Sequence, residues 1–359
     1  MSRFCSQRLS ALEAYTPGEQ PRDQTYIKLN TNESPYPPSP QVLAAVGREE
    51  MENLRLYSDP EGGELRTKLA ALYDLAPDNV FLSNGSDDIL NFAFWAFGGD
   101  GAVFPSLTYS FYPVFCQLHG VSWETVPLEQ DFSLNPELLC GKRKLTVLAN
   151  PNAPTGVALS PAQIETIVAS NPDHVVVVDE AYVDFGAKSV YPLVKKYANL
   201  LVVMTYSKSR SLAGARLGFA LGDKALIGDL NKLKYSTNPY NVNRLSLKIG
   251  QAALDSQAYF DENAKRIIAT REKTGASLRQ MGFRMPPSLA NFLFITKKGL
   301  DGEILYKKLK ERGVLIRHFS DPRIAQYNRV TIGTEEEMAI FLQRVAELLI
   351  EEGTCCANC

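Results

Sequence analysis

The chain has 359 residues, 45% of them hydrophobic and 22% charged, which is typical of a globular protein with two domains or one large domain. Its 38 Lys and Arg residues nearly balance 40 Asp and Glu residues, so the net charge gives no sign of a nucleic acid or an anionic membrane as a partner. We therefore expect small molecules or a second subunit as partners.

The chain begins with an arm, residues 1–35, which we expect to contribute to a small domain. Residues 1–5 do not lead into the apolar core of a signal peptide. The longest apolar runs, at residues 175–178 and 200–204, are far shorter than the roughly 20 residues that cross a bilayer. We predict a cytoplasmic protein without a membrane span.

From Val80 onward, short apolar runs alternate with segments of helical period, a pattern typical of parallel strands joined by helices. The predicted strands are residues 79–83, 101–105, 145–149, 174–179, 200–206 and 218–221, and the predicted helices are residues 85–97, 160–170 and 224–235. This pattern indicates a large α/β domain, which we assign to residues 36–245.

Residues 246–352 are expected to form a small α+β domain. Residues 244–281 read as one or two extended helices, followed by strands near 292–295, 314–317 and 328–333 and by helices at 300–312 and 335–352. Residues 353–359 form a cysteine-rich tail with Cys355, Cys356 and Cys359. Since no histidine lies nearby, we interpret the tail as reduced thiols rather than a metal site.

Lys208 is the most informative residue, because it follows an apolar strand and lies among small hydroxyl residues and two cations, Arg210 and Arg216. A lysine amine is nucleophilic only when deprotonated, and desolvation or a neighbouring cation lowers its pKa. An enzyme could hold an aldehyde cofactor here as a Schiff base, with Arg216 on a phosphate. A solvated surface lysine is the alternative, and the other motifs decide between them.

Asp179 ends the apolar run 175–178, so its carboxylate is expected at the carboxyl end of a buried strand, where open α/β sheets bind ligands. A carboxylate there can pair with the protonated ring nitrogen of pyridoxal phosphate, or it can simply cap the next element. The loop at residues 150–156, which contains Pro154-Thr155-Gly156, follows another strand, so we expect it to converge on the same edge with Lys208.

Residues 83–88 join a strand to an apolar helix, and free N–H groups at a helix N-terminus suit a phosphate; an ordinary N-cap by Ser86 explains them equally well. Tyr109 follows another strand end, where an aromatic ring could stack on a flat cofactor. No dinucleotide or Walker glycine motif, no G-x-S-x-G and no histidine pair is present, so nucleotide binding, serine hydrolysis and metal ligation are disfavoured.

Together, Asp179-Glu180-Ala181-Tyr182, the Pro-Thr-Gly turn, Ser207-Lys208 and Arg216 resemble the fold-type I pyridoxal-phosphate aminotransferases. Within that family, the segments at residues 15–21, 28–33, 56–60 and 239–243 look like those of histidinol-phosphate aminotransferases. The resemblance covers the chain apart from the cysteine tail. It implies a large domain with a mostly parallel seven-stranded sheet, a smaller α+β domain and a homodimer with shared active sites.

By this resemblance Lys208 would form the Schiff base and move the proton, and Asp179 would hold the pyridine nitrogen. Tyr182 would hydrogen-bond the ring's 3-hydroxyl, and Tyr109 would stack on the ring. The cofactor phosphate would be bound by Ser207, Arg216 and the N–H groups of Ser86 and Asp87, and Tyr57 would reach the cofactor phosphate of the neighbouring subunit. Arg329 would bind the substrate carboxylate, and the substrate phosphate would be bound by Tyr15 and Arg317.

Two positions depart from the family pattern. Ala153 replaces the asparagine that commonly touches the 3-hydroxyl, so Asn152 either substitutes or the contact is lost. Arg210 stands where relatives often carry an aromatic or small residue, so it adds charge near the phosphate or points to solvent. The resemblance implies amino transfer between L-histidinol phosphate and 2-oxoglutarate; a threonine-phosphate decarboxylase and an aromatic amino-acid aminotransferase remain the alternatives.

Overall fold

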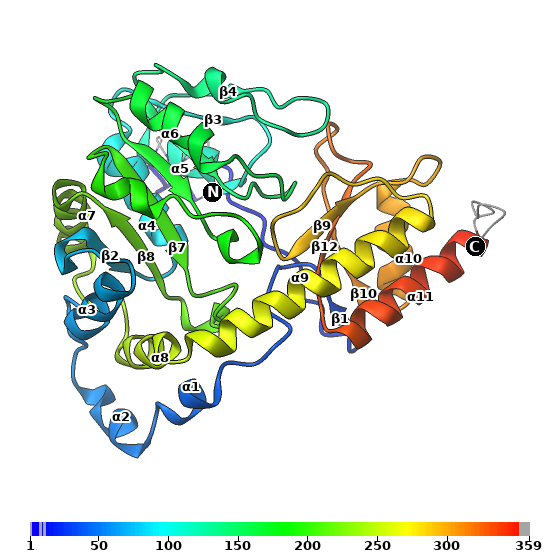
Figure 1. The fold of residues 1–359 in the computed structure, drawn as a ribbon, viewed down its shortest axis with the longest axis horizontal. Coiled ribbons are helices and arrows are strands. Elements are labelled where there is room, and N and C mark those ends of the chain that lie inside the picture. Colours follow the sequence, from blue (N-terminus) through cyan, green and yellow to red (C-terminus); the bar gives the residue numbers. More distant parts are fainter. Residues whose placement is uncertain (1, 7–8, 10–11, 352–359) are drawn as a thin grey trace.

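A computed structural model describes residues 2–6, 9 and 12–351 of the chain, so the predicted cysteine tail lies outside the described residues. The described chain has a larger part built on a wide β-sheet and a smaller part with short strands, and the long helix α9 runs along both (Figure 1). No helix in the described part of the chain is both long and apolar enough to cross a membrane.

The larger part contains a seven-stranded sheet with the order β2-β8-β7-β6-β5-β3-β4. Its strands are β2 (Val80–Ser83), β3 (Ala102–Pro105), β4 (Trp123–Val126), β5 (Leu145–Ala149), β6 (Val176–Asp179), β7 (Leu200–Thr205) and β8 (Gly218–Gly222). Only β8 runs antiparallel to its neighbours. The mostly parallel seven-stranded α/β fold expected from the sequence is therefore confirmed.

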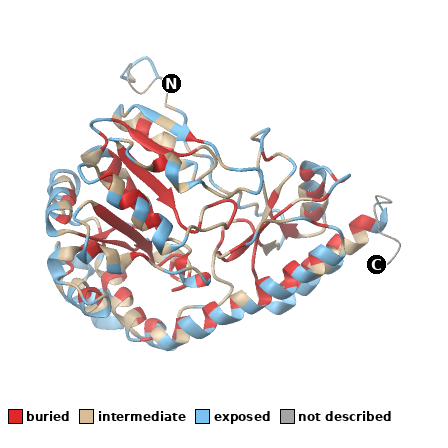
Figure 2. Ribbon diagram, turned by 45° about the horizontal axis from the view of Figure 1, so that its top comes forward, coloured by how far each residue is buried: buried red, intermediate tan, exposed pale blue. Residues whose placement is uncertain are grey.

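Helices cover both faces of this sheet, which is why six of its strands are buried along their whole length (Figure 2). The α-helices are α1 (Pro40–Ala44), α2 (Arg48–Glu52), α3 (Gly63–Leu72), α4 (Ser86–Phe97), α5 (Phe111–His119), α6 (Pro161–Ser170), α7 (Lys224–Thr237), α8 (Arg244–Leu254), α9 (Gln257–Gln280), α10 (Gly302–Glu311) and α11 (Glu335–Glu351). Short 3-10 helices lie at Asn53–Arg55, Pro77–Asn79, Pro136–Leu139, Val183–Phe185, Tyr191–Lys195 and Ala213–Ala215.

The smaller part contains an antiparallel sheet of β11 (Arg317–His318), β12 (Asn328–Thr331) and β9 (Phe292–Ile295), and a parallel pair of β1 (Ile27–Lys28) and β10 (Val314–Leu315). Because β1 belongs to the N-terminal arm, the arm is hydrogen-bonded into the smaller part. The buried residue Phe260 of α9 packs in the core of the larger part, whereas Ala264 and Ile267 pack in that of the smaller part. We propose that the two parts meet within α9.

Three elements of the larger part were not predicted from the sequence. Only Val126 of the edge strand β4 is buried, and the strand has no apolar run. Helix α5 is short and carries a proline in its first turn, and α3 has a weakly amphipathic sequence. In the smaller part, the single strand predicted at residues 314–317 is divided into β10 and β11, because the chain crosses from one sheet to the other there.

Candidate active site

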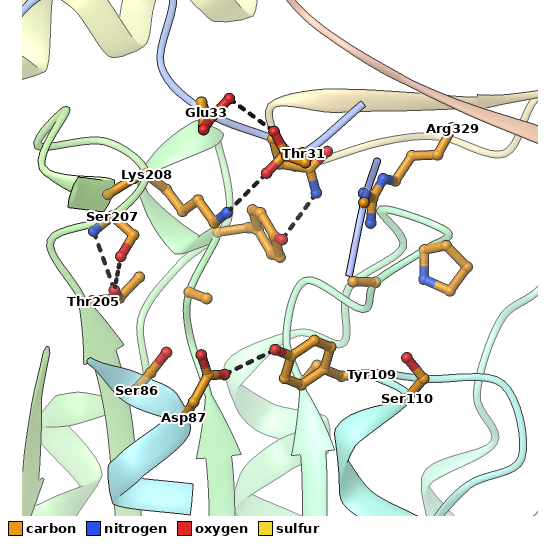
Figure 3. Close-up of a pocket in the computed structure, with 18 of the residues that line it drawn as sticks. Thr31, Glu33, Ser86, Asp87, Tyr109, Ser110, Thr205, Ser207, Lys208 and Arg329 are labelled. Carbon is orange, nitrogen blue, oxygen red and sulfur yellow. Dashed lines mark hydrogen bonds between the residues drawn. The ribbon is translucent and has the colours of Figure 1, made fainter. Parts of the chain in front are cut away.

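The site lies at the carboxyl ends of the central parallel strands. Ala149 of β5 pairs in register with Asp179 of β6, and Asp179 pairs with Val203 of β7, so the loops that follow these strands begin at one edge of the sheet. A cavity of about 390 Å³ opens at this edge. It is lined by twelve of the predicted site residues or their neighbours in the larger part and by residues of the arm and the smaller part (Figure 3): Ser86, Asp87, Tyr109, Ala153, Asp179, Tyr182, Thr205, Ser207, Lys208, Ala213, Gly214 and Arg216, with Tyr15, Thr31, Asn32, Arg317 and Arg329.

Lys208 lies on the turn after β7 and extends into the cavity (Figure 3). Its Nζ donates a hydrogen bond to the backbone oxygen of Thr31 at 3.3 Å and lies 5.6 Å from the ring centre of Tyr182. No carboxylate among the described residues forms an ion pair with this amine, so its contacts leave it available to a ligand.

Asp179 is buried at the floor of the cavity, where Oδ1 accepts from the N–H of Ala181 and Oδ2 accepts from the hydroxyl of Tyr112, both at 3.2 Å. Burial raises the pKa of Asp179 to about 6. No local sequence pattern identified Tyr112, because its contact with Asp179 joins residues 67 positions apart and forms only in the tertiary structure. A buried carboxylate with only two donors suits a cationic ligand group.

One end of the cavity can hold a phosphate. Helix α4 begins there at Ser86 without a side-chain cap on its free N–H groups. A Cβ added to Gly218 would lie 2.6 Å from the nitrogen of Ser86, and one added to Gly85 would lie 2.7 Å from Nη2 of Arg216, so both glycines are needed for this close approach. Arg216 also pairs with Asp87 at 3.1 Å. Together with the nearby Ser207, this cradle fits a phosphate group.

The opposite end of the cavity presents two arginines. Arg317 and Arg329 are direct neighbours across β11 and β12, although like charges in this arrangement repel each other. Neither forms an ion pair with a carboxylate among the described residues; Arg329 donates to the backbone oxygen of Asn30 at 2.9 Å, and Arg317 donates to backbone oxygens of the arm. Burial lowers the pKa of Arg329. This pair is therefore suited to an anionic ligand.

Two tyrosines form the wall between these ends. Tyr109 donates its hydroxyl to Oδ1 of Asp87 at 2.8 Å, and burial raises its pKa well above the usual value. Tyr15 of the arm stacks on Phe111 with ring centres 4.3 Å apart and meets Tyr109 edge-on at 6.3 Å. Burial also raises the pKa of Tyr15. The arm thus covers the cavity with an aromatic ring beside Arg317.

The structure does not bring Asn152 into this cavity. Its amide oxygen accepts from Thr108 at 2.8 Å, and its nitrogen donates to Leu107 and Thr155, both at 3.1 Å. These bonds hold the amide within the loop, and the methyl group of Ala153 lines the cavity in its place. The expected contact of Asn152 with the cofactor is therefore replaced by a structural role, in which its amide holds the loop in place.

Tyr57 and Arg210 also lie away from the cavity wall. Tyr57 is 79% exposed and stacks on Tyr240 with ring centres 4.4 Å apart, so any role at a phosphate requires another subunit. Arg210 is only 6% exposed and lies over the ring of Tyr206 at 5.3 Å. It neither points to solvent nor lines the phosphate end of the cavity.

Asn32 lines the cavity without having been assigned a role from the sequence. Its Nδ2 donates to the hydroxyl of Tyr182 at 2.9 Å, and its backbone has a φ of 57°. The segment 28–33 was recognisable as a family motif, but the partner of its amide lies about half the chain away, so no local pattern could identify the contact.

The family model described as aminotransferase class I and II matches residues 24–345. The histidinol-phosphate aminotransferase of Brachyspira hyodysenteriae is 47% identical over 97% of this chain and 99% of its own length. That of Clostridium acetobutylicum is 43% identical over 97% of this chain and 100% of its own length. The solved histidinol-phosphate aminotransferase of Sinorhizobium meliloti, in complex with pyridoxal 5′-phosphate, has a TM-score of 0.82 and 25% identity, covering 90% of this chain and 91% of that one.

Proposed function

Because the chain belongs to the aminotransferase class I and II family, we propose that it transfers an amino group between L-histidinol phosphate and 2-oxoglutarate, with pyridoxal 5′-phosphate as cofactor. The names of the relatives support this assignment. The observation that carries it is a single cavity that joins Lys208 to two cationic ends, one at Arg216 and one at Arg317 and Arg329.

The free N–H groups of α4 and the glycine cradle fit the cofactor phosphate, and the amine of Lys208, which has no carboxylate partner in the part of the chain that the structure describes, fits its aldehyde. When bound, the cofactor supplies an electron sink for the charge that develops on the substrate carbon. The residues that would hold it are Lys208 at the aldehyde, Asp179 at the ring nitrogen, Tyr182 at the ring oxygen, Tyr109 at the ring face, and Ser207, Arg216 and the N–H groups of Ser86 and Asp87 at the phosphate.

Asp179 would keep a proton on the ring nitrogen. With its pKa raised only to about 6, the group is mostly ionised at neutral pH, and a cationic partner at hydrogen-bond distance favours the ionised form further. The Tyr112 hydroxyl and the Ala181 N–H fix the direction of the carboxylate. Tyr112 therefore acts on the ligand only through Asp179.

Lys208 would serve as the base that takes a proton from the substrate carbon and returns it elsewhere. Its Nζ has one acceptor, the backbone oxygen of Thr31, and an open side toward the cavity. A flexible four-carbon stem lets the amine reach both positions. Among the described residues, no other lysine and no histidine lines the cavity, so no second base of these kinds could replace Lys208.

The two arginines would bind the two unlike substrates in turn. Histidinol phosphate carries a phosphate and no carboxylate, whereas 2-oxoglutarate carries two carboxylates, and a planar guanidinium binds either anion through paired donors. Because Arg317 and Arg329 face each other across β11 and β12, an anion between them also relieves their repulsion. Tyr15 lies beside this pair and would contribute a hydroxyl to the phosphate.

We further propose a homodimer with shared active sites. Large apolar side chains are exposed on α1, α2, the following 3-10 helix and the loops beside them: Leu43, Met51, Leu54, Leu56, Tyr57 and Tyr240. Such a patch is typical of an interface, and it would place Tyr57 at the phosphate of the neighbouring subunit. We also propose a cytoplasmic location, in keeping with Cys116 and Cys140, which form no disulfide among the described residues.

The function is tested by loading the purified protein with pyridoxal phosphate and adding L-histidinol phosphate without an oxo acid. The visible absorption of the cofactor should change to that of its amine form, and 2-oxoglutarate should restore it. O-phosphothreonine and phenylalanine are tested in parallel; carbon dioxide release from phosphothreonine would favour a decarboxylase, and a preference for phenylalanine would favour an aromatic aminotransferase. Lys208→Ala should fold but lose turnover.

A further inference from the structure

Asn32 is a buried asparagine that connects the arm, the smaller part and Tyr182. It is 1% exposed, and its φ of 57° lies in the left-handed region that asparagine tolerates better than most residues. Its backbone oxygen accepts from the Nδ2 of Asn291 at 3.0 Å. The surrounding contacts therefore hold both its backbone and its amide in place.

A chain of hydrogen bonds fixes the orientation of this amide. The backbone N–H of Asn32 donates to Oγ1 of Thr331 at 3.0 Å, and Oγ1 of Thr331 donates to Oδ1 of Asn32, also at 3.0 Å. A backbone N–H can only donate, so the single hydrogen of the Thr331 hydroxyl is left for the amide oxygen. The other end of the amide, Nδ2, must then face Tyr182.

This orientation decides what the Tyr182 hydroxyl can do. Its oxygen accepts the N–H of Asn32 at 2.9 Å, so its own hydrogen is directed elsewhere. No acceptor among the described residues takes that hydrogen, and both Tyr182 and Asn32 line the cavity. The Tyr182 hydroxyl is thus presented to the cavity as a donor, beside the methyl group of Ala153, which can donate nothing.

We propose that Asn32 and Thr331 are positioning residues that set the hydrogen-bond direction of Tyr182, so that its hydroxyl donates to the ring oxygen of the bound cofactor. This inference rests on the proposed function. By this inference the arm, through Asn32, and β12, through Thr331, help to position a cofactor contact. Strand β12 would then serve both cofactor and substrate, since Thr331 lies two residues after Arg329. It also explains how the site works without an asparagine at position 153.

The test compares the single variants Asn32→Asp, Thr331→Val and Tyr182→Phe. Two double variants combine Tyr182→Phe with Asn32→Asp or with Thr331→Val. Aspartate keeps the tolerance for a positive φ but offers Tyr182 only acceptors, so the hydroxyl should turn toward residue 32. Thr331→Val adds no charge and removes the oxygen that fixes the amide. Thr146→Val, a buried threonine of β5 away from the cavity, is the matched control.

Two quantities are measured on each protein: the dissociation constant of pyridoxal phosphate, and the pH midpoint of the visible absorption change of the loaded protein. A donor to the ring oxygen stabilises its ionised form. Asn32→Asp should therefore raise the midpoint by about one pH unit and weaken cofactor binding about tenfold, and Thr331→Val should cause a smaller shift in the same direction. Thr146→Val should change neither quantity.

In the Tyr182→Phe background, Thr331→Val should have no further effect on the midpoint, because it acts through the tyrosine hydroxyl, and Asn32→Asp should shift the midpoint less than in the wild type, because only its added charge then acts. A Thr331→Val shift that persists there, or wild-type midpoints in both single variants while Tyr182→Phe shifts, would overturn the inference and leave the proposed function intact. A wild-type protein that shows no visible cofactor band would overturn both. Thermal unfolding of each cofactor-free variant establishes that it folds.

Discussion

At the scale of single residues, the site contains charges that are unfavourable until a ligand is bound. Arg317 and Arg329 face each other across β11 and β12 without a carboxylate partner among the described residues, and like charges opposed in a sheet cost roughly 0.2–1 kcal/mol. The free energy lost in the empty site is recovered when an anion binds. Ligand binding and stability should therefore respond in opposite directions to the loss of one arginine.

Arg317→Met tests this opposition. We expect the cofactor-free variant to be more stable than the wild type by up to about 1 kcal/mol in urea unfolding, because the repulsion is removed. We expect KM for histidinol phosphate to rise at least about tenfold through the lost charge-assisted hydrogen bonds. The half-reaction with glutamate should suffer less, since Arg329 remains. An equal loss for both substrates, together with lower stability, would contradict this division of roles.

The two adjacent carboxyl groups Asp179 and Glu180 differ in function. Asp179 faces the cavity, whereas Glu180 accepts from the N–H of Val190 at 2.7 Å and from the hydroxyl of Ser189, away from it. Burial raises the pKa of Glu180 from 4.5 to about 8. Its folded-state pKa thus lies above its unfolded one, so the stability it contributes is complete below pH 4.5 and is lost as the pH rises through about 8.

Glu180→Gln should remove this dependence. The difference in unfolding free energy between wild type and variant should change in favour of the variant between about pH 5 and 8, by at most roughly 1.4 kcal/mol per pH unit. Urea unfolding of the cofactor-free proteins at several pH values measures it. Taking the difference cancels the other titrating groups, Asp179 included. A difference that is constant with pH would show that Glu180 has an ordinary pKa in the folded protein.

At the scale of elements, the phosphate end depends on how closely the turn between β2 and α4 approaches β8. A Cβ on Gly218 would meet the carbonyl carbon of Gly85 and the nitrogen of Ser86, both at 2.6 Å. Backbone atoms cannot move aside as a side chain can, so the start of α4 would be displaced. The N–H groups that we assign to the cofactor phosphate would then lose their positions.

Gly218→Ala should therefore weaken pyridoxal phosphate binding by at least about tenfold and lower the melting temperature. Gly228→Ala in α7 is the matched control, because a Cβ there meets nothing within 4 Å; it should stabilise the helix by roughly 0.5–1 kcal/mol and leave binding unchanged. Fluorescence titration and calorimetry measure both effects. Unchanged binding in Gly218→Ala would argue against this cradle.

The sequence was sufficient to predict the elements that are buried and apolar. Strands β5, β6 and β7 and the loops at their carboxyl ends were found because continuous hydrophobic runs end in the Pro-Thr-Gly turn, in Asp179 and in Ser207-Lys208. The edge strand β4 and the aromatic helix α5 lack such a pattern. Each is defined by its neighbours, as α5 is by the aromatic core residues Phe94 and Phe104.

The residues that orient the side chains of the site could not be predicted from the sequence, for a different reason. Tyr112, Asn32 and Thr331 act through hydrogen bonds to residues distant along the chain, so their roles arise only when the tertiary structure forms. Family resemblance decided between the alternative roles that the sequence left open for Lys208 and Asp179, but it also led us to consider Asn152 as a cofactor contact, whereas its amide is bonded within the loop. A shift of one residue in a proline-rich turn changes which side chain faces the cavity.

At the scale of the whole molecule, the site is assembled from three parts of the chain. The larger part supplies Lys208 and Asp179, the smaller part supplies Arg317 and Arg329, and the arm supplies Tyr15 and Asn32. The exposed Tyr57 completes this set only if a second chain provides it, because its own cavity does not include it. A monomer would therefore bind the cofactor phosphate with one contact fewer than a dimer.

Hybrid dimers test this sharing directly. Lys208→Ala removes the base, and Tyr57→Phe removes the hydroxyl that we assign to the neighbouring subunit's phosphate. In a hybrid of the two, the chain that retains Lys208 faces a partner that retains Tyr57, so one of the two sites is of wild-type composition. Two-fold symmetry makes both arrangements equivalent. Each pure variant should be weak or inactive, and light scattering should show a dimer in both.

Mixing equal amounts, unfolding in urea and refolding together should give about half hybrids, and therefore about a quarter of the wild-type activity at saturating substrate but limiting cofactor. Refolding each variant alone, followed by mixing, is the control and should yield no gain until subunits exchange. If Tyr57 served its own chain instead, the hybrid would contain no complete site, because one chain would lack the lysine and the other the tyrosine. Activity no higher than the average of the two pure variants would therefore place Tyr57 outside the shared site.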